Sequence, residues 1–392
     1  MSFQLEEVQK DLRAAKLDGW LFYDFRGRDP IAHRILHLPN HMRTRRWFYF
    51  VPAKGTPAKL VHKIETQSLA ALPGQTLYYS GQDELRKNLK KILGRANNVA
   101  MQYSPKNAIP YVAMVDAGTV ELVRSCGVRV MTSADLVQKY EACWTQAQLQ
   151  SHLQAGKVID RIVAEAFALA ANGVREQKPL TEHELQQWIL REFGKAGLTT
   201  EEGPDVAVNE HASDPHYAPS AERPTPIKEG DLLLLDVWGK SKAEGSVYYD
   251  ISWVGYLGAK VPEKYASVFK ILTAARDKAV ELILSSVAAG KPVQGWQVDK
   301  AARSVVEKAG YGKYFIHRTG HSIGTAVHGN GVNMDGLETH DSRHLIASTC
   351  NSVEPGIYLP EFGMRSEVNV YVGKGEARVT GAVQKEILPL LA

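Results

Sequence analysis

An internal repeat in the second half of the chain constrains its fold more than any other feature. Residues 178–197 align with residues 291–310, and each segment opens with Lys-Pro and closes with Lys-Ala-Gly. Apolar residues at helical spacing predict an amphipathic helix in both segments, and Thr181 with Glu184 forms a capping box in the first. We therefore expect two similar halves packed about a pseudo-twofold axis.

Each half also carries two carboxylates in or beside apolar, strand-like runs. Asp236 lies in LLLLDVW, Asp250 in SVYYDISWVGY, Glu354 in SVEPGIYL and Glu367 in GMRSEVNVYV. The offsets between matched carboxylates are 118 and 117 residues, close to the offset of 113 between the helices. A buried charge costs several kcal/mol unless it is paired or bound to a metal. Two matched pairs meeting at one centre therefore predict a cation site, and His321 in HRTGHSIG adds an imidazole.

Strand periodicity places these carboxylates on one polar face. Side chains alternate between faces with period two, so Glu367 shares a face with Arg365, and Asp250 shares one with Ser252. The opposite faces carry Val368, Val370 and Val372 in one strand and Tyr249, Ile251 and Trp253 in the other. We expect a mixed sheet with an inner polar face and an outer apolar face covered by the two repeat helices.

The charge count favours two divalent cations. Four carboxylates are nearly neutralised by two such ions, which leaves room for a bridging hydroxide. An oxygen-rich ligand set with one imidazole suits Mn²⁺ first and Co²⁺ next, with Zn²⁺ and Fe²⁺ as alternatives. Paired metals ~3.5–4 Å apart lower the pKa of a bound water and polarise a carbonyl, which indicates metal-assisted hydrolysis. The alternative is a buried ion-pair network, for which Arg365 is the only obvious basic partner.

Length indicates two domains, because 392 residues exceed the usual size of a single core. We place an alternating α/β domain at 1–135 and a second domain at 136–392, with the boundary within 133–145. In the first domain the pattern predicts strands at 20–25, 46–52, 59–64, 99–103 and 128–133, with helices before residue 19 and at 83–94 and 114–127. In the second it predicts a long helix from Thr145 to Asn172-Gly173.

Composition indicates a cytoplasmic protein without nucleic-acid or membrane partners. Three cysteines without metal-type spacing are typical of a reducing compartment. No run approaches the roughly 18 apolar residues needed to span a bilayer, and the N-terminus has no apolar signal-peptide core. The net charge is only +4, and we interpret the basic cluster at 41–47 as a solvated loop or subunit contact rather than a nucleic-acid patch.

The motifs HRTGHSIG, VHG, VEPGIY and MRSE, with LLLLD and YYDIS, resemble the pita-bread metallopeptidase family (M24). That family contains prolidase (Xaa-Pro dipeptidase), aminopeptidase P and methionine aminopeptidase. The resemblance covers essentially the whole chain, because the N-terminal α/β unit is similar to the creatinase-type domain of the first two. It implies an α+β protein with a pita-bread catalytic domain and a homodimeric assembly.

The resemblance also implies a role for each candidate site residue. Asp236 would be a terminal ligand of one metal, Asp250 and Glu367 would bridge, and His321 with Glu354 would complete the second metal. Glu354 would also transfer the proton. The substrate-side candidates are His216 beside the scissile bond, His328 at the substrate carbonyl, Arg365 as an orienting arginine, His317 as a core residue or a wall of the proline pocket, and His340 as a partner of the substrate carboxylate.

The leading function is hydrolysis of Xaa-Pro dipeptides, in which a metal-bridging hydroxide attacks the carbonyl before proline. Aminopeptidase P activity on longer peptides is the alternative, whereas methionine aminopeptidase typically lacks this N-terminal domain. A non-catalytic pita-bread binding protein, or a creatinase-like enzyme that works without metal, is less favoured because no ligand is missing.

Three departures from the family pattern lie near the substrate side. The two aspartates are fourteen residues apart instead of eleven, with KSKAEGSV as a longer turn. Asp-Ile-Thr-Arg appears as Asp250-Ile251-Ser252-Trp253, and the usual His-Glu-x-Pro appears as His328-Gly329-Asn330-Gly331. We therefore expect the metal ligands to persist and the recognition of the substrate's length and C-terminus to be altered.

Overall fold

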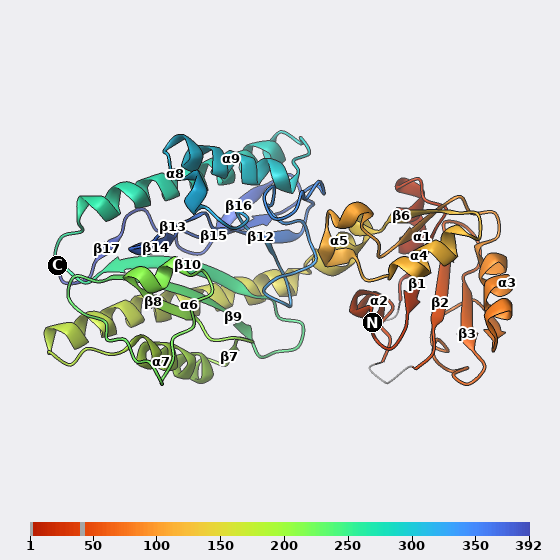
Figure 1. Cartoon of the computed structure of the whole chain (residues 1–392), viewed down its shortest axis with the longest axis horizontal. Coiled ribbons are helices and arrows are strands. Elements are labelled where there is room, and N and C mark those ends of the chain that lie inside the picture. Colours follow the sequence, from red (N-terminus) through yellow and green to blue (C-terminus); the bar gives the residue numbers. More distant parts are fainter. Residues whose placement is uncertain (1–2, 40–43) are drawn as a thin grey trace. The chain divides into compact units, whose positions relative to one another are not determined.

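A computed structural model describes residues 3–39 and 44–392 (Figure 1). It separates into two compact units, Met1–Glu141 and Ala142–Ala392. Residues 41–43 of the basic cluster lie outside the described residues. Among the described helices, none is both long enough and apolar enough to cross a bilayer.

The N-terminal unit is a six-stranded mixed sheet in the order β4-β3-β2-β1-β5-β6. Alternate residues of β1 face two apolar clusters: Trp20 and Phe22 pack with α1, α2 and α5, while Leu21 and Tyr23 pack with α3 and α4. The strands are β1 (Gly19–Asp24), β2 (Trp47–Pro52), β3 (Ala58–His62), β4 (Gln75–Tyr79), β5 (Asn98–Met101) and β6 (Arg129–Thr132). The helices are α1 (Leu5–Ala14), α2 (Pro30–Ile35), α3 (Gln82–Leu93), α4 (Ala117–Arg124) and α5 (Ala134–Ala142), with short 3-10 turns at Pro105–Asn107 and Pro110–Val112.

In the C-terminal unit two pairs of long helices enclose the strands (Figure 1). The helices are α6 (Gln146–Arg175), α7 (Glu182–Lys195), α8 (Glu263–Ala288) and α9 (Gly295–Lys308), with 3-10 turns at Asn209–Ser213 and Gly312–Tyr314. The repeat helices are α7 and α9, as predicted, and Thr181 and Glu184 form the predicted capping box. The end expected for α6 was wrong, because the helix continues through Gly173 to Arg175. That glycine permits a close approach instead, since a Cβ there would lie 2.9 Å from the Lys178 carbonyl oxygen.

The strands of this unit form three hydrogen-bonded sheets instead of the single mixed sheet that we expected. The first contains β7 (Leu198–Thr199), β8 (Asp205–Val208), β9 (Leu232–Ser241), β10 (Tyr249–Tyr256) and β17 (Leu388–Pro389). The second contains β11 (Ser322–Ile323), β12 (Thr349–Val353), β15 (Val368–Val372) and β16 (Ala377–Thr380). The third, β13 (Gly356–Leu359) with β14 (Phe362–Arg365), is a hairpin inserted between β12 and β15. The two carboxylate strands of the second half are therefore partners that are not adjacent in the chain.

Side chains alternate along these strands between an apolar face and a polar face, as predicted. Val368, Val370 and Val372 pack in the cluster that includes α8 and α9, and Tyr249 and Ile251 pack in the cluster that includes α6 and α7. The polar residues of the same strands are left on the faces between the helical layers. Burial of the apolar faces against the helices therefore fixes where the carboxylates lie.

Candidate metal centre

The first half of the site is set by the antiparallel register of β9 and β10. Asp236 lies opposite Ser252, and Asp250 lies opposite Trp238. Residues directly opposite each other in an antiparallel pair project from the same face, so both aspartates share the inner face. Asp236 is 8% exposed and Asp250 is 5% exposed, which makes both carboxylates costly without a cation.

The second half supplies its acids from just outside two paired strands. Val353 and Val368 are the terminal pair of β12 and β15, so Glu354 and Glu367 flank the same end of that ladder. His321 directly precedes β11 and is tied to β12, because Ser352 donates its N–H to the His321 carbonyl at 2.9 Å. Three segments that are distant in the sequence thus converge at one strand end.

Asp250, His321 and Glu367 form a group whose possible ligand atoms all lie within 4.8 Å of one another. Nε2 of His321 is 3.4 Å from Asp250 Oδ2 and 3.2 Å from Glu354 Oε1. Its Nδ1 lies 3.3 Å from the Ser322 carbonyl, which can only accept, so Nδ1 carries a proton. The neutral tautomer therefore directs the lone pair of Nε2 at the carboxylates, as a metal ligand requires.

Ser252 and Arg365 join the two halves. Nε of Arg365 donates to the Ser252 hydroxyl at 3.0 Å, and its Nη2 contacts Asp236 Oδ2. The Ser252 hydroxyl lies 2.9 Å from both Asp236 Oδ1 and Glu367 Oε2. A hydroxyl has one proton, so it can donate to only one of these acids at a time.

The donor set fits divalent cations. Glu367 is 1% exposed, and its Oε1 has no hydrogen-bond partner among the described residues. Such an orphaned buried oxygen is expensive unless it binds something. Arg365 and a protonated His321 supply only two positive charges to four carboxylates. A closed ion-pair network is therefore less consistent with the site than cation binding.

The pKa values of these side chains reflect the shortage of positive charge among them. Burial, followed by the neighbouring acids, raises the pKa of Asp236 to about 7 despite Arg365, and raises the pKa of Asp250 and of Glu367. Burial would also raise the pKa of Glu354, but its contact with His321 outweighs that effect and lowers it. Burial alone would lower the pKa of His321, but hydrogen bonding to Asp250 and Glu354 raises it to about 9.

Two of the predicted substrate-side histidines lie at the His321 end. The ring of His328 packs edge-on against the ring of His321, with centroids 4.4 Å apart, while the residue as a whole stays accessible to solvent. The charge of His321 and then burial lower the pKa of His328 to about 3, and His216 adds to this effect from nearby. Both histidines are therefore placed to meet a substrate at this end.

The other two candidate histidines differ in their surroundings. Nδ1 of His317 donates to the Arg318 carbonyl at 2.6 Å, and its Nε2 accepts from the Tyr358 hydroxyl at 2.7 Å. That hydroxyl accepts from Arg365 Nη1 at 3.2 Å, so His317 belongs to a chain that holds the arginine. Burial lowers the pKa of His317 to about 4. His340 stacks on Trp296 with ring centroids 5.1 Å apart, and no described contact joins it to the carboxylates.

Asp205 is a fifth acid beside the centre, and it was not among the residues predicted from the sequence. It lies on β8 directly opposite Asp236. Burial and then the negative charge of Asp236 raise its pKa to about 8. The sequence pattern that could have indicated Asp205 is DVAV, a short apolar strand that begins with an acid. The pairing of this strand with the strand of Asp236 is visible only in the structure.

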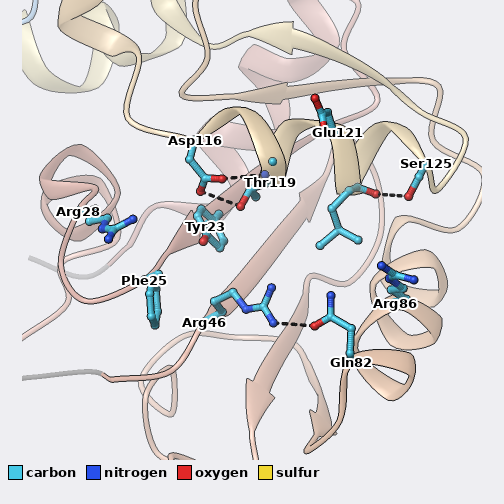
Figure 2. A pocket seen from close by; sticks show the side chains of 12 residues that line it. Tyr23, Phe25, Arg28, Arg46, Gln82, Arg86, Asp116, Thr119, Glu121 and Ser125 are labelled. Atoms are coloured by element: carbon cyan, nitrogen blue, oxygen red, sulfur yellow. Dashed lines mark hydrogen bonds between the residues drawn. The ribbon is translucent and has the colours of Figure 1, made fainter.

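A separate pocket of 570 Å³ lies in the N-terminal unit (Figure 2). Arg46 donates to Gln82 at 2.9 Å, and both carboxylate oxygens of Asp116 are engaged by Thr119, at 2.9 and 2.8 Å. None of the predicted site residues lines this pocket. Three arginines and two acids line it, so it lacks the excess of carboxylates found at the metal centre.

The fold and the centre define a two-domain α+β protein of the metallohydrolase class. The sequence matches metallopeptidase family M24 over residues 150–374. It is 27% identical over 329 residues to "Probable dipeptidase PepE" of Mycobacterium tuberculosis, which covers 82% of this chain and 80% of that protein. It is also 27% identical over 236 residues to an Xaa-Pro dipeptidase of Lactobacillus delbrueckii subsp. lactis, which covers 60% and 58%.

Among solved structures, dipeptidase PepE from Mycobacterium ulcerans superposes with a TM-score of 0.71 at 24% identity, covering 98% of this chain and 96% of that one. The prolidase from Pyrococcus horikoshii has a TM-score of 0.59 at 19% identity, covering 98% and 99%. These likenesses establish the two-domain pita-bread fold.

The chain belongs to metallopeptidase family M24. It is therefore a peptidase that uses divalent metal ions, and its substrates are peptides. The family resemblance found in the motifs is confirmed, and so are the predicted fold class and the prediction of an enzyme.

Proposed function

We propose that the chain is an Xaa-Pro dipeptidase with two divalent cations, Mn²⁺ by first choice. The observation that supports this proposal is that Asp250, His321 and Glu367 offer ligand atoms within 4.8 Å of one another, with Glu367 Oε1 left without a hydrogen-bond partner among the described residues. Asp236 joins this group through the Ser252 hydroxyl, and Glu354 joins it through His321. Asp236 would hold one cation, Asp250 and Glu367 would bridge, and His321 with Glu354 would hold the other. The names of the relatives, dipeptidase and Xaa-Pro dipeptidase, support the substrate class.

The chain's own residues would divide the remaining chemistry between them. When bound, the two cations would lower the pKa of a water molecule and polarise the substrate carbonyl. Glu354 would take the proton of the attacking water and pass it to the departing proline nitrogen. His328 would donate a hydrogen bond from its neutral ring to the developing oxyanion. His216, exposed beside it, would orient the substrate next to the scissile bond.

Arg365 would act through the ligands it contacts. It donates to Asp236 and to the Ser252 hydroxyl, and that hydroxyl reaches Glu367. Groups that hydrogen-bond metal ligands fix their orientation, and their loss typically lowers metal affinity tenfold to about 100-fold. Arg365 is thus proposed as a positioning residue rather than as a direct contact of the substrate. His340 is assigned no role, because no described contact joins it to the carboxylates.

The preferred length of the substrate distinguishes dipeptidase activity from aminopeptidase P activity. With Mn²⁺ supplied, we expect faster turnover of Ala-Pro than of Ala-Pro-Ala and longer peptides, and little turnover of Ala-Ala. Faster cleavage of the longer proline peptides would assign aminopeptidase P activity instead. Protein that binds no metal after reconstitution with Mn²⁺ would point to a non-catalytic binding role.

Assembly and location follow from the same proposal. We propose a homodimer, which sedimentation equilibrium would test, and a cytoplasmic location consistent with three cysteines that lack metal-type spacing. We also propose that the functional domains meet within residues 133–145, the segment that contains the limit between the two compact units.

A further inference from the structure

Asp205 extends the row of polar residues at the metal centre by one strand. In the register of the first sheet, Asp236 lies between Asp205 on β8 and Ser252 on β10. Both pairings are antiparallel, so the three side chains project from the same face. The row therefore runs Asp205, Asp236, Ser252 across three neighbouring strands.

The packing of β8 agrees with this orientation. Val206 and Val208 lie in the apolar cluster that includes α6 and α7, whereas Ala207 lies with Leu234 in the cluster that includes α8 and α9. Leu234 precedes Asp236 by two residues, as Asp205 precedes Ala207 by two. Period-two alternation therefore puts the carboxylate of Asp205 on the face that carries the metal ligands.

Asp205 is partly buried and differs from the proposed ligands in its contacts. Among the described residues, no hydrogen bond or ion pair involves its carboxylate, whereas each of the other four acids has at least one. Arg365 directs its donors to Asp236, Ser252 and Tyr358. The carboxylate of Asp205 thus lies beside the centre without a counter-charge in contact with it.

The charge of Asp205 exceeds what two cations need. The four acids Asp236, Asp250, Glu354 and Glu367 already match two divalent ions. Asp205 adds a fifth acid beside Asp236, and no described contact joins it to His321 or His328, which pack on each other. A positive charge that arrived with the substrate would favour the ionised form of this carboxylate and would be bound by it.

We propose that Asp205 binds the α-ammonium group of the substrate's N-terminal residue. This inference rests on the proposed function. In that function the peptide bond to be cleaved would lie between His328 and Asp205. If the carbonyl under attack lies beside His328, the free N-terminus of the peptide would lie beside Asp236 and Asp205. One residue then fits between the ammonium site and the carbonyl under attack, which makes Asp205 a determinant of cleavage after the first residue.

A ligand pair that differs only in the amine isolates this contact. Alanine hydroxamate and propionohydroxamate share the metal-chelating group, and only the first carries an α-ammonium. We expect the Mn²⁺-loaded wild type to bind alanine hydroxamate more tightly in calorimetric titration. In Asp205→Asn this preference should fall about 10- to 100-fold, the range for a lost charge-assisted hydrogen bond. An unchanged preference would overturn the proposal.

Three further measurements separate other roles of Asp205. Asp205→Asn should keep the metal content of the wild type, whereas loss of a metal ion would identify Asp205 as a ligand and overturn the proposal. A matched control, Glu202→Gln, removes a nearby exposed charge and should leave the amine preference unchanged. If Asp205→Asn altered only the preference for lysine over norleucine hydroxamate, the site would bind a basic side chain, against the proposal.

Turnover distinguishes failure of this inference from failure of the proposed function. A wild type that does not hydrolyse Ala-Pro contradicts the proposed function. A wild type that hydrolyses Ala-Pro, with Asp205→Asn showing the same KM, contradicts only the role of Asp205. The proposal predicts that KM for Ala-Pro rises about 10- to 100-fold in Asp205→Asn with a smaller change in kcat, and that Asp205→Glu recovers part of the loss.

Discussion

Nε2 of His321 lies 3.2 Å from Oε1 of Glu354 in the ligand-free centre. In that state the imidazole holds a second proton up to about pH 9 and so takes the place of a cation between the acids. A divalent ion can use the Nε2 lone pair only after this proton leaves. Metal binding is therefore coupled to proton release at His321.

The stabilisation that metal gives should rise with pH between 6.5 and 9. The pKa of His321 is raised from 6.5, so its contribution to metal-free stability is complete below pH 6.5 and is lost as pH rises through about 9. The raised pKa of Asp236 acts in the same direction at lower pH, because its contribution is lost between pH 3.8 and about 7. The check is the difference in Tm between Mn²⁺-loaded and chelator-treated protein, and a difference that is constant with pH would contradict the coupling.

Replacement of Ser252 by alanine should weaken the binding of Mn²⁺ and lower the free energy of unfolding. The change leaves Arg365 Nε without its acceptor and removes the hydroxyl that links Asp236 to Glu367. We expect a loss of about 1–3 kcal/mol in the free energy of unfolding and a roughly 10- to 100-fold weaker affinity for Mn²⁺. Ser252→Thr keeps the hydroxyl and is the matched control. Equal metal affinities of the two variants would refute the role of the hydroxyl.

Gly320 and Gly324 offer a steric comparison on either side of the ligand His321. A Cβ at Gly320 would lie 2.0 Å from the Ser352 carbonyl oxygen, whereas at Gly324 the nearest atom is 3.9 Å away. Gly320→Ala should force the His321 segment away from β12, lower the free energy of unfolding by about 1–3 kcal/mol and reduce metal binding. Gly324→Ala should be close to wild type in both thermal denaturation and Mn²⁺ titration. Similar behaviour of the two variants would contradict the close approach.

Glu354 tests the proposed proton transfer. Glu354→Ala removes both a ligand and the acid/base group, so turnover of Ala-Pro should fall at least about 100-fold. The exposed Glu361, in the turn between β13 and β14, provides the control Glu361→Ala, which should retain activity. Circular dichroism would confirm that both variants fold. Retained turnover in Glu354→Ala would refute its assigned role.

Much of the metal centre could be predicted because acidic residues are rare within apolar strands, and several of its ligands lie in or beside such strands. Asp236, Asp250 and Glu367 stand out as acids in or beside apolar strands, and the repeat offsets pair them across the two halves. Strand alternation then predicted the faces of β10 and β15, which the packing confirms. In the N-terminal unit, apolar runs predicted β1, β2, β3, β5 and β6, but β4 and the helices α2 and α5 were missed.

The remaining features depend on register and on contacts between distant segments. Asp205 joins the centre only because β8 pairs with β9, which no local pattern in the sequence specifies. Ser252 appeared as a conservative replacement, yet its hydroxyl contacts two acids and an arginine. The expectation of a single sheet was wrong because, in the described residues, β9 and β10 pair with neither β12 nor β15, and β13 and β14 pair only with each other.

Metal content is the most direct test of the account, because every proposed role depends on two cations held by five side chains. The measurement is elemental analysis of protein purified without chelator, loaded with Mn²⁺ and dialysed to remove weakly bound ions. We expect two Mn²⁺ per chain. One ion per chain, or none, would contradict the dinuclear centre.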